Sequence, residues 1–513
     1  MTTRLLLVEN GQALDAAALP RLEPAAFQQV LADSLTAGAR VSAYFGQPWP
    51  APPGPSAAPA PPATLVTAVL ANDAEGRLGL LSTVVGGAWP SLAEECPALH
   101  LFERELAEQC GVVPLGHPWL KPVRFEPPLT AARAAPGAPP PPGAAPFFAM
   151  AGEEVHEVAV GPVHAGIIEP GHFRFQCHGE HVFHLEISLG YQHRGLERLL
   201  LGGPTARTSG LVESIAGDTV VGHALASARA LEGLAGVEAP PRAAWLRALA
   251  LELERLANHV GDLGALAGDV GYLPTASFCG ALRADYLNAL AELCGNRFGR
   301  GLVVPGGTRF DLSAEAAGRL RARLVATLEK VEAAADLFFE SPSVRNRTEG
   351  TGVVSKAVAA QLGLVGPVAR ASGLAVDVRR SHPFAPHLPA ALPALGGGGD
   401  GDVQARARVR LDELRQSAQL VDGWLGALPA GPVRRPLPPL QPGRLVVSLV
   451  EGWRGELCHV VRTDGAGRFE RYKVVDASFH NWKGLELAMR GEQISDFPLC
   501  NKSFNLSYCG HDL

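Results

Sequence analysis

The chain contains 513 residues, of which 19% are charged and 47% hydrophobic, a composition typical of globular proteins large enough for more than one core. Its 45 basic and 51 acidic side chains give a net charge of −6, which excludes the strongly basic surface of a nucleic-acid-binding protein. The apolar stretch from Leu5 to Val8 is too short for a signal peptide, and no later run approaches the ~18 apolar residues of a membrane span. We therefore expect a cytoplasmic chain.

Stretches rich in proline, alanine or glycine divide the sequence. Residues 48–62 predict a solvated insertion within an N-terminal domain that covers residues 1–126. Residues 127–150 predict a linker, because proline lacks an N–H donor and fixes φ. A second domain then covers residues 151–513, with a glycine-rich loop at 396–402.

The second domain has mostly helical periodicity. Residues 242–270 place apolar side chains at steps of three to four residues, and residues 312–339 and 404–428 behave similarly. Residues 444–475 instead alternate between apolar and polar side chains, with a turn at Asp464 and Gly465, which predicts antiparallel strands. The expected fold class is α+β: a small N-terminal α+β domain, then a large helix-dominated domain that includes antiparallel strands.

The cysteines are scattered, and no pair has the C-x-x-C spacing that is typical of metal sites and redox motifs. In a cytosolic chain this pattern predicts free and mostly buried thiols. Cys500 and Cys509 are expected to be packing residues, and the alternative is that they form a remnant metal site with His511.

Five separated blocks carry a resemblance to a known family. Residues 100–118 read HLFERELAEQCGVVPLGHP, which resembles the signature of the 30 kDa subunit of complex I. The segments 161–199, 238–307, 345–384 and 451–513 are similar, in the same order, to the complex I 49 kDa subunit and the large subunit of group 4 [NiFe]-hydrogenases. The resemblance implies that both modules are fused in one chain, as in hydrogenases of the formate hydrogenlyase type.

The nickel ligands of those hydrogenases have no counterparts here. In the family, R-x-C-G-x-C-x-x-x-H and D-P-C-x-x-C motifs supply four thiolates to the metal. The matching positions in this sequence hold Ala216, Thr219, Ser507 and Gly510. Alanine cannot ligate a metal, and nickel in such sites depends on soft sulfur donors. We therefore expect no metal ligands in this chain, and the resemblance implies Fe–S clusters in a partner subunit instead.

In complex I the same region, without nickel, holds a quinone head group. His164 occupies the histidine position of the family's G-P-x-H motif, where an imidazole can bond a quinone carbonyl or deliver a proton. A purely structural hydrogen bond is the alternative. The complex I pattern also has a partner tyrosine, but this sequence has no tyrosine between Tyr191 and Tyr272.

The same blocks supply further candidates. Arg194 and Glu197 lie one helical turn apart and can pair, and Glu254 and Asn258 share a helix face that can line a polar cavity or a proton path. Structural ion pairs and hydrogen bonds are the alternatives for all of them. The charged residues Arg345, Arg347, Asp377, Arg379 and Arg380 predict buried pairs. The candidate catalytic residues are His164, His223 and Glu197, and the candidate cofactor-binding residues are His164, His193, Arg194, Glu254, His259 and Arg347.

The resemblance implies a respiratory-chain role on the cytoplasmic face of the inner membrane. The chain would couple electron transfer from an Fe–S small subunit to a quinone or another acceptor, with a ferredoxin-like subunit and ion-pumping membrane subunits as partners. No G-x-G-x-x-G fingerprint is present, so any NAD chemistry belongs to a partner. A working hydrogenase subunit and a non-catalytic scaffold are the alternatives.

Overall fold

The computed structural model describes residues 5–49, 63–129, 142–384 and 399–513. Nearly all of the proline-rich insertion, the middle of the expected linker and the first part of the glycine-rich loop therefore lie outside the described residues. The division of the chain into two domains at residues 127–150 stays a prediction.

The N-terminal part forms a sheet in the order β1-β6-β5-β4, in which neighbouring strands run antiparallel, and β3 adds to β6 in parallel. Trp49 pairs with Ala63, so the proline-rich insertion connects the adjacent ends of two paired strands. Helix α1 packs on β6 and helix α2 on β4. The elements are β1 (Leu6–Val8), β3 (Arg21–Leu22), α1 (Pro24–Thr36), β4 (Arg40–Trp49), β5 (Ala63–Asn72), β6 (Arg77–Val85), β7 (Ala88–Pro90), α2 (His100–Cys110) and β8 (Val113–Leu115).

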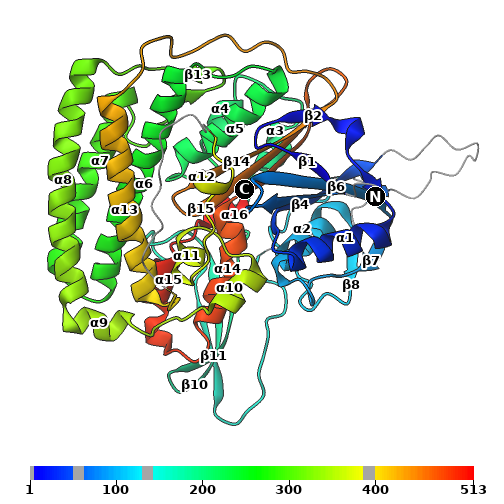
Figure 1. Ribbon diagram of the computed structural model, residues 1–513. Helices are drawn as coiled ribbons and strands as arrows, with labels where there is room; N and C mark the ends of the chain where they lie inside the picture. The colour runs from blue at the N-terminus through cyan, green and yellow to red at the C-terminus, as the bar shows by residue number, and fades with distance from the viewer. Residues whose placement is uncertain (1–4, 50–62, 130–141, 385–398) are drawn as a thin grey trace, which may run out of the picture.

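A second sheet joins the two ends of the sequence. Strands β14 (Arg444–Gly452), β15 (Gly455–Thr463) and β16 (Phe469–Val475) are antiparallel, as their alternation predicts. The short strand β2 (Ala13–Asp15) extends this sheet by pairing with β14. Apolar side chains of both sheets share one core, which places the N-terminal strands beside β14 and β15 (Figure 1).

Long helices make up the other side of the molecule (Figure 1). Helix α6 lies at their centre, contacts α7, α13 and α8, and buries most of its residues. The helical periodicity predicted for residues 242–270, 312–339 and 404–428 is confirmed by α6, α8 and α13. These long helices are α5 (Val220–Ala235), α6 (Pro241–Asp269), α7 (Leu273–Cys294), α8 (Ala314–Glu340) and α13 (Val403–Gly426).

Short elements connect the sheets to the helices. Strands β11, β10 and β9 form an antiparallel sheet in that order, and β12 pairs with β13. No helix in the described ranges is long and apolar enough to cross a membrane. The short elements are β9 (Val155–Val160), β10 (His172–His178), β11 (His181–Ser188), α3 (Leu196–Leu200), α4 (Thr208–Val212), β12 (Val303–Val304), β13 (Gly307–Thr308), α9 (Pro342–Thr348), α10 (Lys356–Leu362), α11 (Gly366–Ala371), α12 (Val378–Ser381), α14 (Ala477–Ala488), α15 (Phe497–Phe504) and α16 (Tyr508–Asp512).

Candidate functional site

The two segments that match the nickel-binding motifs meet in space. The guanidinium of Arg194 donates to the carbonyl oxygens of Ile215 and Cys509, each at 3.0 Å. Arg454 makes a second bridge, because its Nε donates to the Asn505 carbonyl oxygen and its Nη1 to Thr219 Oγ1 at 3.2 Å. The fold therefore brings the residues before α5 and the residues around α16 together.

The side chains between these segments do not fit nickel. Arg454 forms a two-pronged ion pair with Asp218, with N···O distances of 2.6 and 2.8 Å. Ser507 Oγ is already bonded, since it accepts from the Gly510 N–H at 2.9 Å. A Cβ atom at Gly510 would lie 2.8 Å from Asp476 Cγ, so the site has no free space for a cysteine there. Positions 216, 219, 507 and 510 thus hold a methyl group, two bonded hydroxyls and a glycine, and the Arg454 guanidinium lies beside them.

Electrostatics holds this pair ionised. Burial alone would raise the pKa of Asp218, but the Arg454 guanidinium outweighs it and lowers the pKa. Burial likewise opposes the charge of Arg454, and the Asp218 carboxylate raises the pKa of that guanidinium above its ordinary value. The Arg454 side chain is buried, whereas Asp218 is 35% exposed, so the pair sits at the edge of the interior.

A chain of buried hydrogen bonds begins beside this ion pair. Asp476 Oδ2 lies 3.1 Å from His223 Nε2, and His223 Nδ1 lies 3.1 Å from His459 Nε2. His459 Nδ1 lies 3.0 Å from the Tyr472 hydroxyl, which donates to Ser227 Oγ at 2.9 Å. We call these five residues the histidine chain. It joins α5 and strands β15 and β16 to the residue that caps α14.

Burial and hydrogen bonding together set the charges in the histidine chain. Burial alone would raise the pKa of Asp476, but the hydrogen bond from His223 outweighs burial and lowers this pKa to about 2. Burial, with His223 nearby, lowers the pKa of His459 well below its usual value, so this imidazole is neutral at pH 7. The chain therefore combines one carboxylate with imidazole and hydroxyl groups that can each donate or accept a proton.

Glu254 faces the same region from α6. Its carboxyl group accepts from the N–H groups of Val221 at 2.7 Å and Gly222 at 3.2 Å, at the start of α5. Burial raises the pKa of Glu254 to about 8 despite these bonds, so the group is mostly protonated at pH 7. Asn258 Nδ2 donates to the Asp218 carbonyl oxygen at 3.0 Å. Glu254 and Asn258 thus lie on one helix face toward residues 218–222, as their spacing predicts.

The predicted pair between Arg194 and Glu197 is wrong. Helix α3 begins only at Leu196, so Arg194 lies outside the helical turn that would bring it to Glu197. Glu197 instead accepts from Arg471 at 2.8 Å and Lys473 at 3.0 Å, both from β16. Burial opposes ionisation of Glu197, but these two cations dominate and hold the pKa of its carboxyl group well below the ordinary value.

The other candidates are more dispersed. His164 lies in the loop between β9 and β10, where Nε2 is 2.8 Å from the Gly171 carbonyl oxygen. His193 Nδ1 is 2.8 Å from the Asp512 carbonyl oxygen. Within the described ranges, no hydrogen bond or ion pair connects His164 to the histidine chain.

His259 and Arg347 occupy different environments. His259 Nε2 is 2.8 Å from Glu413 Oε2 inside the helical core, and burial lowers the pKa of the imidazole. Arg347 lies on α9, is 43% exposed and pairs with Asp496 at 3.0 Å. The structure thus does not bring Arg347 to the other candidates.

The prediction of buried ion pairs among the five charged residues between 345 and 380 is confirmed only in part. Asp377 and Arg379 form a buried pair at 2.8 Å. Arg345 and Arg347 are 54% and 43% exposed and pair on the surface with Glu349 and Asp496, and Arg380 is exposed, so the prediction of burial is wrong for these three arginines. Helix α9 buries only Val344 and Thr348, so its arginines lie on the exposed side and need no buried partner.

None of the cysteines forms a disulfide, and all except Cys96 and Cys509 are buried, as the cysteine pattern predicts. Ser507 Oγ lies 3.4 Å from Cys509 Sγ. Among the described residues, no group of three or more histidine, cysteine, aspartate or glutamate side chains is arranged to hold a metal ion.

Sequence reasoning assigned no role to Asp218, Arg454, His459 or Asp476. Asp218 and Arg454 lie in segments that the sequence analysis compared with family motifs. Each is a charged residue among mostly apolar neighbours, and this pattern could have indicated a buried ion pair. His459 could have been noticed as a polar residue within a buried strand.

Comparison with known proteins agrees with this architecture. Residues 269–444 and 439–512 match the family described as "Respiratory-chain NADH dehydrogenase, 49 Kd subunit". The carbon monoxide-induced hydrogenase of Rhodospirillum rubrum is 33% identical over 356 residues, which cover 68% of this chain and 97% of that protein. NADH-quinone oxidoreductase subunit 4 of Thermus thermophilus is 30% identical over 371 residues, which cover 67% of this chain and 90% of its own length.

A solved structure shares the fold. A chain of the membrane-bound sulfane sulfur reductase, described as an archaeal respiratory membrane complex, aligns with a TM-score of 0.64 and 26% identity over 70% of this chain and 99% of its own. The first two relatives are named as a hydrogenase and as a subunit of an NADH-quinone oxidoreductase. The chain belongs to the family of complex I 49 kDa subunits and group 4 hydrogenase large subunits.

Proposed function

We propose that this chain is the large subunit of a complex I-like, energy-converting oxidoreductase that works without nickel. It would receive electrons from an Fe–S cluster in a partner subunit and couple their transfer to proton movement and to reduction of a quinone. The observation that carries this proposal is the Arg454–Asp218 ion pair, which fills the place between the two former metal-binding segments and lies beside the histidine chain.

The chemistry of these residues argues against a hydrogenase. Alanine at 216 and glycine at 510 offer no side-chain donor atoms, and nickel in such sites depends on soft sulfur donors. Asp218 is held in an ion pair with Arg454, so its carboxylate is already engaged.

The histidine chain supports a role in proton movement. When the Tyr472 hydroxyl donates to Ser227, Nδ1 of His459 carries the proton and Nε2 of His459 can accept from His223. When that hydroxyl rotates toward His459, the imidazole of His459 carries its proton on Nε2 and donates to His223, while the Asp476 carboxylate accepts from His223 in both arrangements. The two arrangements differ in which nitrogen of His459 carries the proton, and such a change of tautomer is what a relay between Tyr472 and His223 requires.

The β9–β10 loop supports an acceptor site at His164. Its Nε2 faces the Gly171 carbonyl oxygen, which leaves Nδ1 for another partner. Val163 and Ile167 in the same loop are 83% and 86% exposed, an apolar surface suited to a quinone ring or to a membrane subunit. The relatives are named for hydrogen, quinone and sulfane sulfur chemistry, so the acceptor has to be identified by assay.

The N-terminal part supports the fused organisation. We infer that residues 1–126 act as the 30 kDa-type module, since α2 carries the matching signature and packs against β4 of the N-terminal sheet. As partners we infer an Fe–S small subunit, a ferredoxin-like subunit and ion-pumping membrane subunits, with the chain on the cytoplasmic face of the membrane. NADH would react at a partner subunit.

The first experiment is metal analysis of the purified complex, combined with hydrogen-uptake and quinone-reduction assays. The expected result is iron without nickel, no hydrogen turnover, and quinol formation that falls when His164 is changed to alanine. Stoichiometric nickel with hydrogen turnover would restore the hydrogenase, and reduction of polysulfide in place of quinone would reassign the acceptor. Iron with no reductase activity toward any acceptor would favour the scaffold.

A further inference from the structure

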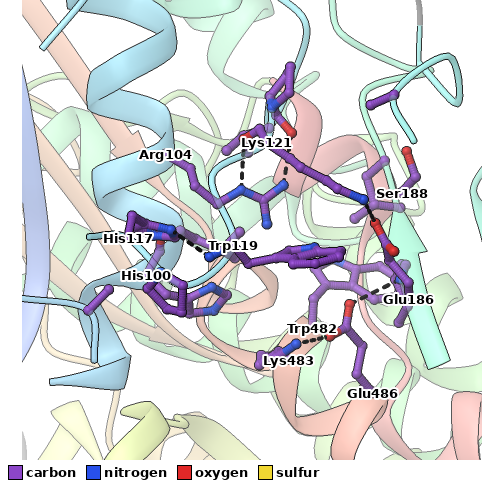
Figure 2. A pocket seen from close by; sticks show the side chains of 18 of the residues that line it. His100, Arg104, His117, Trp119, Lys121, Glu186, Ser188, Trp482, Lys483 and Glu486 are labelled. Atoms are coloured by element: carbon purple, nitrogen blue, oxygen red, sulfur yellow. Dashed lines mark hydrogen bonds and ion pairs between the residues drawn. The ribbon is translucent and has the colours of Figure 1, made fainter. Parts of the chain in front are cut away.

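A cavity of about 360 Å³ lies between the N-terminal part and the sheet that contains β11. Helix α2, the residues that follow β8, strand β11 and helix α14 surround it, and it shares no lining residue with the histidine chain or the Arg454–Asp218 pair. Its volume lies within the range of small-molecule sites. Six lining residues carry the argument: Arg104, Trp119, Lys121, Phe147, Trp482 and Lys483 (Figure 2).

Arg104 is a cation without a carboxylate partner. Its Nε donates to the Lys121 carbonyl oxygen at 2.8 Å and its Nη2 to the Pro122 carbonyl oxygen at 2.9 Å. Nη1 has no hydrogen-bond acceptor, and no carboxylate lies within ion-pairing distance of the guanidinium among the described residues. Burial lowers the pKa of Arg104, and the charges of Glu486, Glu108 and Glu186 partly offset this effect. A cation in this position is stabilised by an anion that binds from the cavity.

The carboxylates near Arg104 are already bonded elsewhere. Glu186 pairs with Lys121 and accepts from the Phe148 N–H at 2.8 Å. Glu486 pairs with Lys483 and accepts from the Ile187 N–H at 3.0 Å. These two ion pairs leave Arg104 without a carboxylate partner, and Glu94, the remaining glutamate of the lining, is exposed and makes no ion pair with Arg104 among the described residues.

The Trp482 indole supplies another spare donor. Its Nε1 is buried and finds no acceptor among the described residues, although the residue lines the cavity. The lining residues thus include two N–H donors without an acceptor among the described residues, Arg104 Nη1 and Trp482 Nε1, while Glu186 and Glu486 are already bonded. A ligand that satisfies both donors must bring acceptor oxygens.

Aromatic side chains form the remaining wall. In Figure 2 the Trp119 ring lies across the cavity between Arg104 and the Lys483–Glu486 pair, with Trp482 behind it. Lys121 Nζ lies 4.2 Å from the centre of the Trp119 ring, and Phe147 adds a further apolar surface. Flat rings bind well against such faces.

We propose that this cavity binds a small organic anion with a flat ring, whose carboxylate takes the free donors of Arg104 and Trp482 and whose ring stacks on Trp119. The site is additional to the electron-transfer function proposed above and does not depend on it.

The test uses 2-naphthoate as the probe and neutral 2-naphthamide as its isostere, with the intact complex in a calorimetric titration. The expected result is one molecule of 2-naphthoate per chain, bound at least ~10-fold more tightly than the amide, the factor that one charge-assisted bond supplies. Arg104→Gln should abolish this preference. Arg345→Gln, which removes a surface cation that pairs with Glu349, should leave it unchanged.

Arg104 also donates to the carbonyl oxygens of Lys121 and Pro122, so Arg104→Gln could disturb the fold. A second variant, which removes none of these bonds, is therefore included. Trp119→Ala removes a cavity wall whose side chain makes no hydrogen bond among those described, and it should weaken both probes by a similar factor. Equal affinity for the two probes, or unchanged 2-naphthoate binding in either folded variant, would overturn the proposal. If Arg104→Gln fails to assemble, the Trp119→Ala result decides.

Discussion

Arg454 and Asp218 form a two-pronged ion pair, with N···O distances of 2.6 and 2.8 Å. The same guanidinium also donates to Thr219 Oγ1 and to the Asn505 carbonyl oxygen, so one side chain ties the residues before α5 to the residues before α16. The structural role of this pair and the proposal that the chain works without nickel can each be tested.

Removing the guanidinium should destabilise the fold. Arg454→Met leaves the partly buried Asp218 carboxylate without its partner, and we expect a loss of about 1–3 kcal/mol, between the values for exposed and fully buried pairs. Arg345→Met, which removes an exposed pair with Glu349, should have a much smaller effect on stability. Urea unfolding of both variants measures the difference, and equal losses would contradict a special role for Arg454.

Restoring the four cysteines should not restore nickel. In the quadruple variant Ala216→Cys, Thr219→Cys, Ser507→Cys and Gly510→Cys, the new Cβ at 510 would lie 2.8 Å from Asp476 Cγ, and the Arg454 cation would stay in place. We expect no stoichiometric nickel after growth with the metal. Metal analysis checks this, and a nickel-loaded quadruple variant would show that the ion pair yields to the metal.

Much of the fold could be predicted from the sequence because its long elements have strong local patterns. The apolar stripe of α6 and the alternation in β14–β16 identify these elements without any tertiary information. The pairing of Ala13 with Val446 could not be predicted, since a three-residue strand has too little pattern and its partner lies at the other end of the sequence. The shared core follows from that pairing.

In the site, too, individual residues could be selected from the sequence, but contacts between distant residues could not. His223 and Glu254 could be selected because they stand in family motifs, but the contact between His223 and Asp476 joins residues 253 positions apart. The prediction that Arg194 pairs with Glu197 is wrong because the i,i+3 rule assumes a helix through both residues, and α3 starts after Arg194.

Protonation of Glu254 should make stability depend on pH. Its folded pKa of about 8 lies above the ordinary value of 4.5, so between these values the folded state binds more protons than the unfolded state. Stability from this group is then complete below pH 4.5 and is lost as the pH rises toward 8. Glu254→Gln should flatten the fall in Tm between pH 5.5 and 7.5, measured by calorimetry. An identical slope in wild type and variant would contradict the raised pKa.

The histidine chain should control proton delivery during turnover. Tyr472→Phe removes the hydroxyl that bonds His459 but keeps the aromatic ring. The proposed relay therefore loses its group at residue 472, while the packing of the ring is unchanged. We expect quinone reduction by the complex to slow by about 10–100-fold, with a larger solvent isotope effect and a shifted pH profile. Tyr286→Phe is the matched control, because that buried hydroxyl has no hydrogen-bond partner among the described residues and lies on α7. If the Tyr472→Phe complex reduces quinone as fast as the Tyr286→Phe control, the loss of the Tyr472 hydroxyl leaves proton delivery intact. The histidine chain would then have a structural role only.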